Sequence, residues 1–335
     1  MSREVHVRFW ESARVRVPRA THLPLYRIER ISERQGVPIA RSTLAQWVGQ
    51  LGVALQPLVD RLVALLKQGK ILHADETPVQ QLDPGQGKTQ RAYLWAYRSN
   101  DLEGAPRIVV FDYQSSRSGQ HARDFLAGWR GHLMVDDYGG YKETFRQGVT
   151  ELACLAHCRR KFFDLKAAGG HPVAEEALRR IGALYAIEAQ ARDRDASARL
   201  ALRQHEALPR LTELHDWLVA QRIRTADGTG LARAIDYSLK RWTALLRYVD
   251  NGELPVDNNS VENAIRPITL GRRNWLFTGS ERAGRRAAAI QSLLNTAKLN
   301  GLEPYAWLKD TLERLPTWPY SRIDELLPLK AVPAQ

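Results

Sequence analysis

Three acidic residues occupy places in the sequence where a lone carboxylate needs an explanation. Asp75 and Asp136 each follow a short apolar run typical of a buried strand, at 71–74 and 133–135. Glu262 lies far downstream, in a segment that reads as a helix with an N-cap at its start. A carboxylate at the end of a buried strand costs free energy unless something pairs with it. Three that meet in the fold would hold two divalent cations about 3.5–4 Å apart, the arrangement of a phosphoryl-transfer site.

Each acid taken singly has an ordinary explanation, since aspartate often ends a strand and a helix glutamate is usually solvated. The joint pattern favours a site, because Glu262 lies one turn after Asn258 and faces the same way. Glu76 and Asp137 are one residue out of phase and are expected on the opposite strand face. Oxygen ligands suit Mg²⁺, so we expect two Mg²⁺ ions, one activating the attacking water or 3′-hydroxyl and the other stabilising the leaving oxygen.

The chain is basic, with 49 Lys and Arg against 37 Asp and Glu in 335 residues, a net charge of +12 and a pI near 9.9. This excess predicts a polyanionic partner such as nucleic acid. Three basic clusters flank the acids in sequence and would pair with backbone phosphates: Arg159, Arg160 and Lys161; Arg272 and Arg273; Arg282, Arg285 and Arg286. Trp275 and Phe277 either stack on an unpaired base or belong to the core.

The composition is that of a soluble globular protein of two or three domains, with 44% hydrophobic and 26% charged residues. Its two cysteines, Cys154 and Cys158, provide no disulfide framework, which favours the reducing cytoplasm. We see no signal peptide and no apolar run near ~20 residues. We therefore expect a bacterial cytoplasmic protein, associated with the nucleoid when bound to DNA, with no membrane partner.

The first segments of the chain are predicted to be helical. Residues 1–21 are unassigned, and 22–68 form a helical segment. Within it, 24–50 read as two short helices around Gly36-Val37-Pro38, with Ser42 as N-cap of the second. This pair is either a helix-turn-helix that reads DNA or a plain helical hairpin. The apolar spacing at 55–66 predicts an amphipathic helix.

Residues 69–168 switch to strand patterns. Strands are predicted at 70–77, 91–98, 107–113, 131–136 and 150–156, with a helix at 118–129. This order indicates an α/β fold, a ribonuclease-H-like mixed five-stranded sheet with flanking helices. We expect an all-helical insertion at 169–252, the second part of the catalytic core with Glu262 at 253–300, and a helical carboxy-terminal segment at 301–335. A helix at 282–299 should stop at Asn300-Gly301.

Several motifs resemble the transposases of the bacterial insertion sequence 66 family, specifically the large, TnpC-like subunit. The resemblance covers roughly residues 22 to 330 and is carried by His-Leu-Pro-Leu-Tyr-Arg at 22–27, Leu-His-Ala-Asp-Glu-Thr-Pro at 72–78, Cys-Leu-Ala-His-Cys-Arg-Arg-Lys-Phe at 154–162, Asp-Asn-Asn-Ser-Val-Glu at 257–262, Leu-Gly-Arg-Arg-Asn at 270–274 and Arg-Ile-Asp-Glu-Leu-Leu-Pro at 322–328.

The resemblance implies an Asp-Asp-Glu transposase whose triad falls on Asp75, Asp136 and Glu262. It implies Mg²⁺, for which Mn²⁺ can substitute, and double-stranded DNA of element ends and target as partner. A homo-oligomer in a synaptic complex and accessory proteins of the same element are further expected partners. The family's Cys-x-x-His signature falls on Cys154 and His157.

His157 is expected to contact DNA or position the scissile phosphate, with a satisfied core histidine as the alternative. Zinc is disfavoured here, because Cys154, His157 and Cys158 offer at most three ligands where structural zinc takes four.

The chain departs from the family before His22, where longer members carry a Cys-bearing region. This departure predicts a truncated reading frame and leaves three functions open. The first is a transposase that cleaves DNA and transfers strands at element ends. The second is a non-catalytic DNA-binding remnant or regulator of transposition, and the third is a ribonuclease-H-like nuclease without strand transfer.

Overall fold

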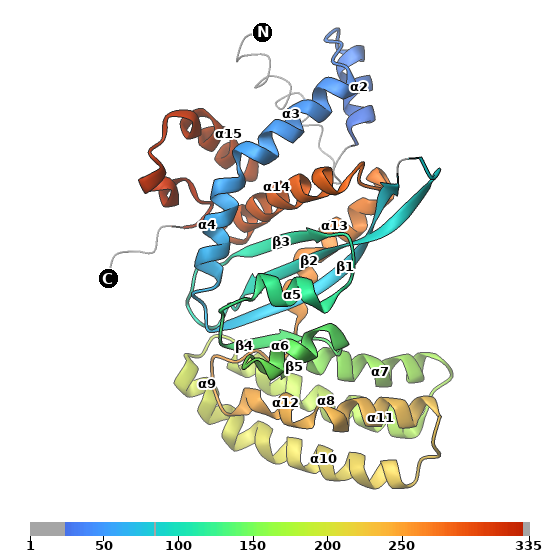
Figure 1. Ribbon diagram of the computed structural model, residues 1–335. Helices are drawn as coiled ribbons and strands as arrows, with labels where there is room; N and C mark the ends of the chain where they lie inside the picture. Colours follow the sequence, from blue (N-terminus) through green and yellow to red (C-terminus); the bar gives the residue numbers. More distant parts are fainter. Residues whose placement is uncertain (1–23, 84, 331–335) are drawn as a thin grey trace.

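A five-stranded mixed sheet forms the centre of the computed structural model (Figure 1). The structure describes residues 24–83 and 85–330, with the backbone alone of Arg273 and Asn274. Residues 1–21, the motif start at 22–23 and the predicted turn residue Pro84 lie outside the described residues. The strands are β1 (Ile71–Asp83), β2 (Lys88–Ser99), β3 (Val109–Gln114), β4 (His132–Val135) and β5 (Thr150–Ala153).

The strands lie in the order β3-β2-β1-β4-β5. β1 pairs antiparallel with β2, and β2 with β3, whereas β1 and β4, and β4 and β5, are parallel. All five predicted strands are therefore confirmed. β1 and β2 extend further than predicted and stay paired as far as Asp83 and Lys88. This extension forms because alternate residues of β1 beyond residue 77, such as Val79 and Gln81, remain buried.

Helices cover both faces of the sheet. α13 (Asn259–Trp275) and α14 (Glu281–Leu299) bury Val261, Ile265 and Ala288 against one face of β1, β2 and β3. The opposite face is covered by α4 (Gln56–Leu66), α5 (Gly119–Phe125), η1 (Gly139–Tyr141) and α6 (Lys142–Arg146). Because side chains alternate along a strand, neighbouring residues of β1 face different helical layers.

α13 and α14 were predicted only in part. α13, whose end the sequence left open, runs to Trp275 and so includes Arg272, and Pro267 lies inside it. A proline inside a helix removes a hydrogen bond, but Val261, Ala264, Ile265 and Ile268 keep α13 packed on the sheet. α14 ends before Asn300 and Gly301, which has a φ of 68°, as predicted.

The amino-terminal helices are α2 (Leu25–Arg34) and α3 (Arg41–Ala54). Two helices around the predicted turn are confirmed, but Ser42 is not the N-cap, because α3 begins at Arg41 after Ala40. α3 crosses α14 closely: a Cβ on Gly52 would lie 2.6 Å from the Cβ of Arg286. Among the described helices no single one is long and apolar enough to cross a membrane, although α3 and α4, bent by 44°, meet that test together.

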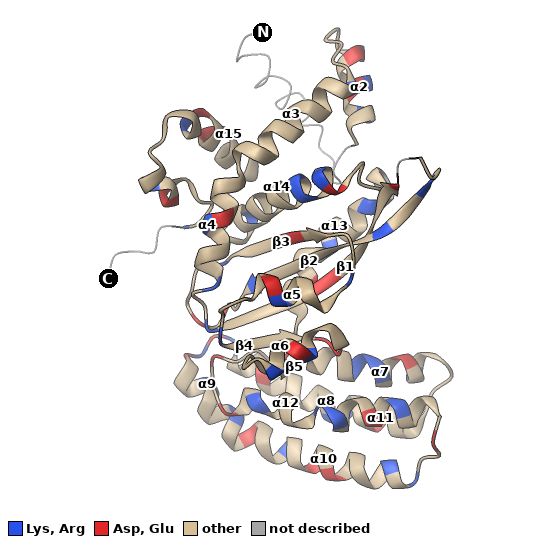
Figure 2. Cartoon of the chain, in the orientation of Figure 1, with Lys and Arg blue, Asp and Glu red and all other residues tan. Residues whose placement is uncertain are grey.

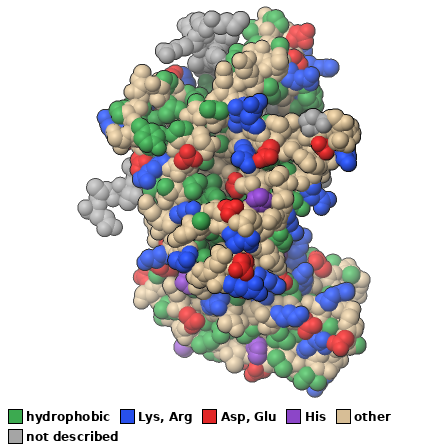
Figure 3. Space-filling view, in the orientation of Figure 1, with side chains coloured by type: hydrophobic (Ala, Val, Ile, Leu, Met, Phe, Trp, Pro, Cys, Tyr) green, Lys and Arg blue, Asp and Glu red, His purple; other side chains and the backbone are tan. Residues whose placement is uncertain are grey.

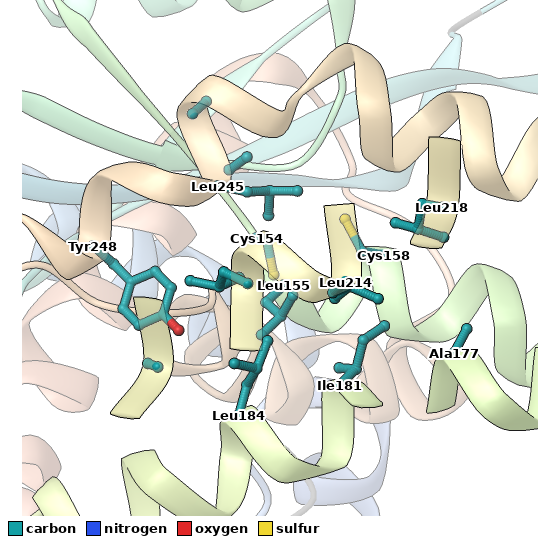
Figure 4. Packing of buried hydrophobic residues seen from close by; sticks show 14 of the residues in the cluster. Cys154, Leu155, Cys158, Ala177, Ile181, Leu184, Leu214, Leu218, Leu245 and Tyr248 are labelled. Carbon is teal, nitrogen blue, oxygen red and sulfur yellow. The ribbon is translucent and has the colours of Figure 1, made fainter. Parts of the chain in front are cut away.

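The stretch between β5 and α13 is helical, as predicted, and lies beside the sheet as a separate layer of helices (Figure 1). Its core is formed by α7 with α8, α10 and α11, and it includes Leu155, Cys158, Ile181 and Leu214 (Figure 4). Its elements are α7 (Leu155–Ala167), α8 (Pro172–Ala191), α9 (Ala196–Leu202), the π-helix η2 (Arg203–Ala207), α10 (Leu208–Ile223), α11 (Gly230–Lys240), α12 (Trp242–Leu246) and η3 (Arg247–Val249).

Two buried arginines fix the segment that returns from these helices to α13. The Arg203 guanidinium donates to the carbonyls of Tyr248, Asn251 and Leu254 at 2.9–3.1 Å and pairs with Glu188 at 2.6 Å. Arg199 donates to the Gly252 carbonyl at 2.6 Å. These bonds satisfy carbonyls that no helix or strand ladder satisfies, so the approach to α13 is held in one conformation.

The carboxy-terminal elements are α15 (Pro304–Arg314), η4 (Leu315–Thr317) and η5 (Tyr320–Leu326). They pack on the same core as α4, to which Ile323 and Leu326 contribute. An ion pair between Arg61 of α4 and Asp324 at 2.5 Å joins the two segments. This helical end of the chain was predicted.

Candidate active site

Asp75 lies on β1, and Asp136 directly follows the end of its parallel neighbour β4. In the β1–β4 pairing His73 lies opposite Met134, so continuing the register by two residues sets Asp75 beside Asp136. Parallel neighbours lie about 4.8 Å apart across a sheet. The Oδ1 of Asp75 accepts the Glu76 N–H, and that of Asp136 accepts the Tyr138 N–H, both at 2.8 Å. Within the described residues neither carboxylate has an ion pair with a basic side chain.

Asn258 brings the start of α13 against β1. Its fully buried side chain donates from Nδ2 to the Ala74 carbonyl at 2.9 Å, and its Oδ1 lies 3.0 Å from His73 Nδ1. Its backbone N–H points at the Cys154 sulfur, 3.2 Å away. Asn258 occupies the N-cap position of α13, but its side chain makes no capping hydrogen bond, so the predicted capped start has a different role. It joins the start of α13 to β1 beside Asp75 and to the end of β5.

The protonation of His73 follows from these bonds. Because Asn258 Nδ2 donates to a carbonyl, its Oδ1 must be the acceptor, and His73 Nδ1 must carry the hydrogen. Burial lowers the pKa of His73 to about 4, so the imidazole is neutral at ordinary pH. This contact was not predicted from the sequence. His73 and Asp75 are alternate residues of one strand and must face the same side of the sheet, which was the available signal.

Glu262 lies in the first turn of α13 and faces His157. Its Oε1 is 3.7 Å from His157 Nδ1, and both atoms are buried without a hydrogen-bond partner in the described part of the chain. Ligand atoms of Cys154, His157 and Glu262 all lie within 4.8 Å of one another, a group that excludes Asp75 and Asp136. Cys158 is not part of it, and Glu262 stands in its place beside the Cys-x-x-His pair.

Charge repulsion acts on Asp75. Burial, followed by the charges of Glu76 and Asp136, raises the pKa of Asp75 to about 8, and Glu262 adds to this shift. A nearby cation would reverse it. The oxygen donors, the unbonded Glu262 Oε1 and the absence of a paired base near Asp75 among the described residues fit a hard divalent cation.

The two neighbouring acids are engaged elsewhere. Glu76 faces the α5 side of the sheet, opposite to Asp75 as predicted, where Arg117 pairs with it at 2.6 Å and the Tyr141 hydroxyl donates to it at 3.1 Å. Asp137 lies 3.4 Å from Arg241, at the end of α11. Glu76 therefore supplies negative charge near Asp75 without sharing its pocket.

The predicted basic clusters are distributed unequally (Figure 2). Arg159, Arg160 and Lys161 are exposed on α7, directly after His157. Arg272 donates to the Pro78 carbonyl of β1, and the side chain of Arg273 lies outside the described residues.

The third cluster lies on α14, which packs on the edge strand β3, two strands from β1. There Arg282 is exposed, Arg285 pairs with Glu281 at 2.6 Å and Arg286 packs on α3. The structure therefore places the α7 cluster directly after His157 and Arg272 against β1, whereas the α14 cluster lies at the β3 edge of the sheet.

The aromatic pair is divided between two environments. Trp275 is partly buried against the core between α13 and the sheet, which matches its packing alternative. Phe277 is 41% exposed, after Leu276, whose φ is 60°. The chain then pairs with β1, since Thr278 N–H donates to the Gln80 carbonyl. On the face shown in Figure 3 basic side chains alternate with acidic ones, so the positive charge forms no single continuous patch there.

Comparison with known proteins identifies relatives along nearly the whole chain. The family model described as "Transposase IS66 family" matches residues 18–286, and "IS66 C-terminal element" matches residues 292–329. In Sinorhizobium fredii, the uncharacterized protein y4qI is 39% identical over 321 residues, 92% of this chain and 60% of that protein. The uncharacterized proteins y4jD and y4hP are 38% and 35% identical, over 88% and 92% of this chain. The chain spans about three fifths of the length of these relatives.

Proposed function

Because the chain belongs to the IS66 family of transposases, we propose that it carries the catalytic core of a DNA transposase. In this proposal Asp75, Asp136 and Glu262 form an Asp-Asp-Glu triad that binds two Mg²⁺ ions, or Mn²⁺ in their place. The reaction is cleavage at the ends of an insertion sequence, followed by attack of the freed 3′-hydroxyl on target DNA. The strand order β3-β2-β1-β4-β5, with two antiparallel pairs followed by two parallel pairs, supports a ribonuclease-H-like fold for this core.

The observation that carries the proposal is the convergence of three distant segments around Asp75. Asp136 lies beside it through the β1–β4 register, and Asn258 pins the start of α13 to the carbonyl that precedes it. The charges of Asp136 and Glu262 both raise the pKa of Asp75, which supports a shared site for the three carboxylates. A fold that gathers acids at this cost gains from a cation that offsets their repulsion.

The side chains of this site would act by positioning. Asp75 and Asp136 are each oriented by a backbone N–H, and Glu262 is carried by a helix whose start is anchored in the core. Bound Mg²⁺ supplies Lewis acidity and activates the attacking oxygen. His157 is placed to contact the scissile phosphate beside the carboxylates, and Arg159, Arg160 and Arg272 to contact flanking phosphates.

The proposed partners follow from the family. They are double-stranded DNA of element ends and target, a second copy of the chain in a synaptic complex, and accessory proteins of the same element. A cytoplasmic location, on the nucleoid when DNA is bound, fits this role. The relatives are longer than this chain, so recognition of the ends by this polypeptide is part of the proposal to be tested.

The test supplies the purified chain with pre-nicked DNA ends of its own element, a target duplex and Mg²⁺. Products in which an element end is joined to the target duplex support the transposase function. Cleavage without joining indicates a nuclease, and DNA binding without either product indicates a non-catalytic remnant.

In the same assay Asp75→Ala, Asp136→Ala and Glu262→Ala should each abolish product formation and leave DNA binding nearly intact. The matched control is Asp137→Ala, an exposed neighbour engaged with Arg241. A triad variant with full activity, or an equally inactive Asp137→Ala, would overturn the assignment.

A further inference from the structure

We propose that Cys154, His157 and Glu262 form a second metal site, for a borderline-soft divalent cation such as Zn²⁺, and that its occupation withdraws Glu262 from Asp75 and Asp136. The ligand atoms of these three residues lie within 4.8 Å of one another. The site itself is independent of the proposed function, whereas its inhibitory effect rests on that function.

The ligand chemistry separates this site from the Mg²⁺ site. A thiolate, an imidazole and a carboxylate are the ligands that Zn²⁺ takes, while Mg²⁺ takes oxygen and avoids sulfur. Three protein ligands with an open fourth position characterise an exchangeable zinc site rather than a structural one. From the sequence, zinc was disfavoured because Cys154, His157 and Cys158 offer at most three ligands where structural zinc takes four; the structure again offers three protein ligands, with Glu262 in place of Cys158.

Burial raises the pKa of the Cys154 thiol, so the sulfur keeps its proton until a cation binds, but two features of its surroundings favour a bound thiolate. Its sulfur accepts the Asn258 N–H at 3.2 Å, and the residue occupies the N-cap of α7, where helix N–H groups favour negative charge. The thiol is buried, so its proton passes to solvent only as a cation takes its place. Access is from the side of His157 and Glu262, whose side chains are 28% and 36% exposed.

Two further atoms have no hydrogen-bond partner among the described residues. His157 Nδ1 and Glu262 Oε1 are buried and lie 3.7 Å apart, too far for a hydrogen bond to each other. One cation between them and the Cys154 sulfur would satisfy both. A cation held by Glu262 Oε1 leaves only Oε2 for the Asp-Asp-Glu arrangement and fixes the carboxylate towards His157, so we expect the soft cation to compete with that arrangement.

Cobalt(II) titration of the purified full chain, in buffer without Mg²⁺, tests the site directly. Wild type should develop visible d–d absorption together with a near-ultraviolet sulfur-to-cobalt charge-transfer band, and Zn²⁺ should displace both. Cys154→Ser should abolish the charge-transfer band. His157→Ala and Glu262→Gln should weaken cobalt binding by about tenfold or more, by analogy with other losses around metal sites.

The matched control is Cys158→Ser, because Cys158 is equally buried, lies one turn along α7 and is outside the ligand group. It should keep the band. Circular dichroism verifies that each variant is folded. The site is overturned if folded wild type shows no charge-transfer band, or if Cys154→Ser retains it.

A second measurement addresses inhibition. Zn²⁺ should suppress Mg²⁺-dependent DNA cleavage by wild type. Cys154→Ser should need at least about tenfold more Zn²⁺ for the same suppression. Equal sensitivity of the two proteins contradicts the inhibitory role. A chain without any cleavage activity refutes the proposed function and, with it, this role, whereas the cobalt spectra still decide the site.

Discussion

At the scale of single residues, the site depends on side chains whose charge and hydrogen bonds are controlled by burial. Asp75 is surrounded by acids and lacks a basic partner among the described residues. Asn258 uses both ends of its amide and its backbone N–H to join three segments. Each of these features predicts a measurable effect.

Asp75 predicts a pH dependence of stability in the metal-free protein. Its pKa is raised from 3.8 to about 8, so between these values the folded state holds a proton that the unfolded state has lost. This contribution to stability is full below about pH 4 and is lost as the pH rises towards 8. Urea unfolding in a chelator should show the loss in wild type and a flatter profile in Asp75→Asn.

Mg²⁺ should recover stability at pH 8 for wild type and far less for Asp75→Asn. Identical pH profiles of the two proteins would show that Asp75 titrates normally.

Asn258 predicts an energetic effect with a neighbouring control. Asn258→Ala leaves the His73 Nδ1–H and the Ala74 carbonyl buried without partners, which should cost about 1–3 kcal/mol for each group. Asn259 is exposed and bonds only Asp257, so Asn259→Ala should change the free energy of unfolding by about 0.5 kcal/mol or less. Chemical denaturation measures both, and equal values would refute the anchoring role.

At the scale of elements, the position of α13 depends on the helical segment that precedes it in the chain. The helical layer between β5 and α13 shares one core, and buried arginines hold the chain that leaves it. The helix then packs along β1 and β2 despite Pro267. The position of Glu262 therefore depends on the packing of these distant elements and not on the short motif around it.

Arg203 predicts the cost of loosening this return segment. Arg203→Met removes a fully buried guanidinium from Glu188 and from three carbonyls, so it should destabilise the fold by about 3–5 kcal/mol. Adding Glu188→Leu should recover part of the loss, because no unpaired charge remains. Arg210→Met, which breaks an exposed pair with Glu206, should cost about 0–1 kcal/mol. Denaturant unfolding of all three variants distinguishes a buried network from a surface pair.

At the scale of the whole molecule, a net charge of +12 predicts salt-dependent DNA binding, but its distribution is uneven. Among the described arginines, some are engaged in ion pairs or packing, as at Arg285 and Arg286, while α7 presents exposed basic residues beside the site. DNA binding should therefore depend on the basic residues near the site rather than on the net charge of the whole chain.

This expectation is testable by counterion release. Arg160→Ala and Lys161→Ala should each reduce the slope of log K against log salt by about 0.9, if each contacts one phosphate of duplex DNA. Arg210→Ala removes the same charge from α10 and should leave the slope unchanged. Equal effects of all three, measured by fluorescence anisotropy over a salt series, would indicate that only net charge matters.

The sequence by itself determined the five strands and most helices, because apolar periodicity is a local property, and it singled out the three acids whose joint role is proposed above. It misplaced one cap, Ser42, because α3 begins one residue earlier, at Arg41. Only the tertiary structure decided that Asn258 joins His73 and Ala74, and that Glu262 faces Cys154 and His157. Such contacts bring together residues far apart along the chain, and the packing of the helical layer and α13 selects them.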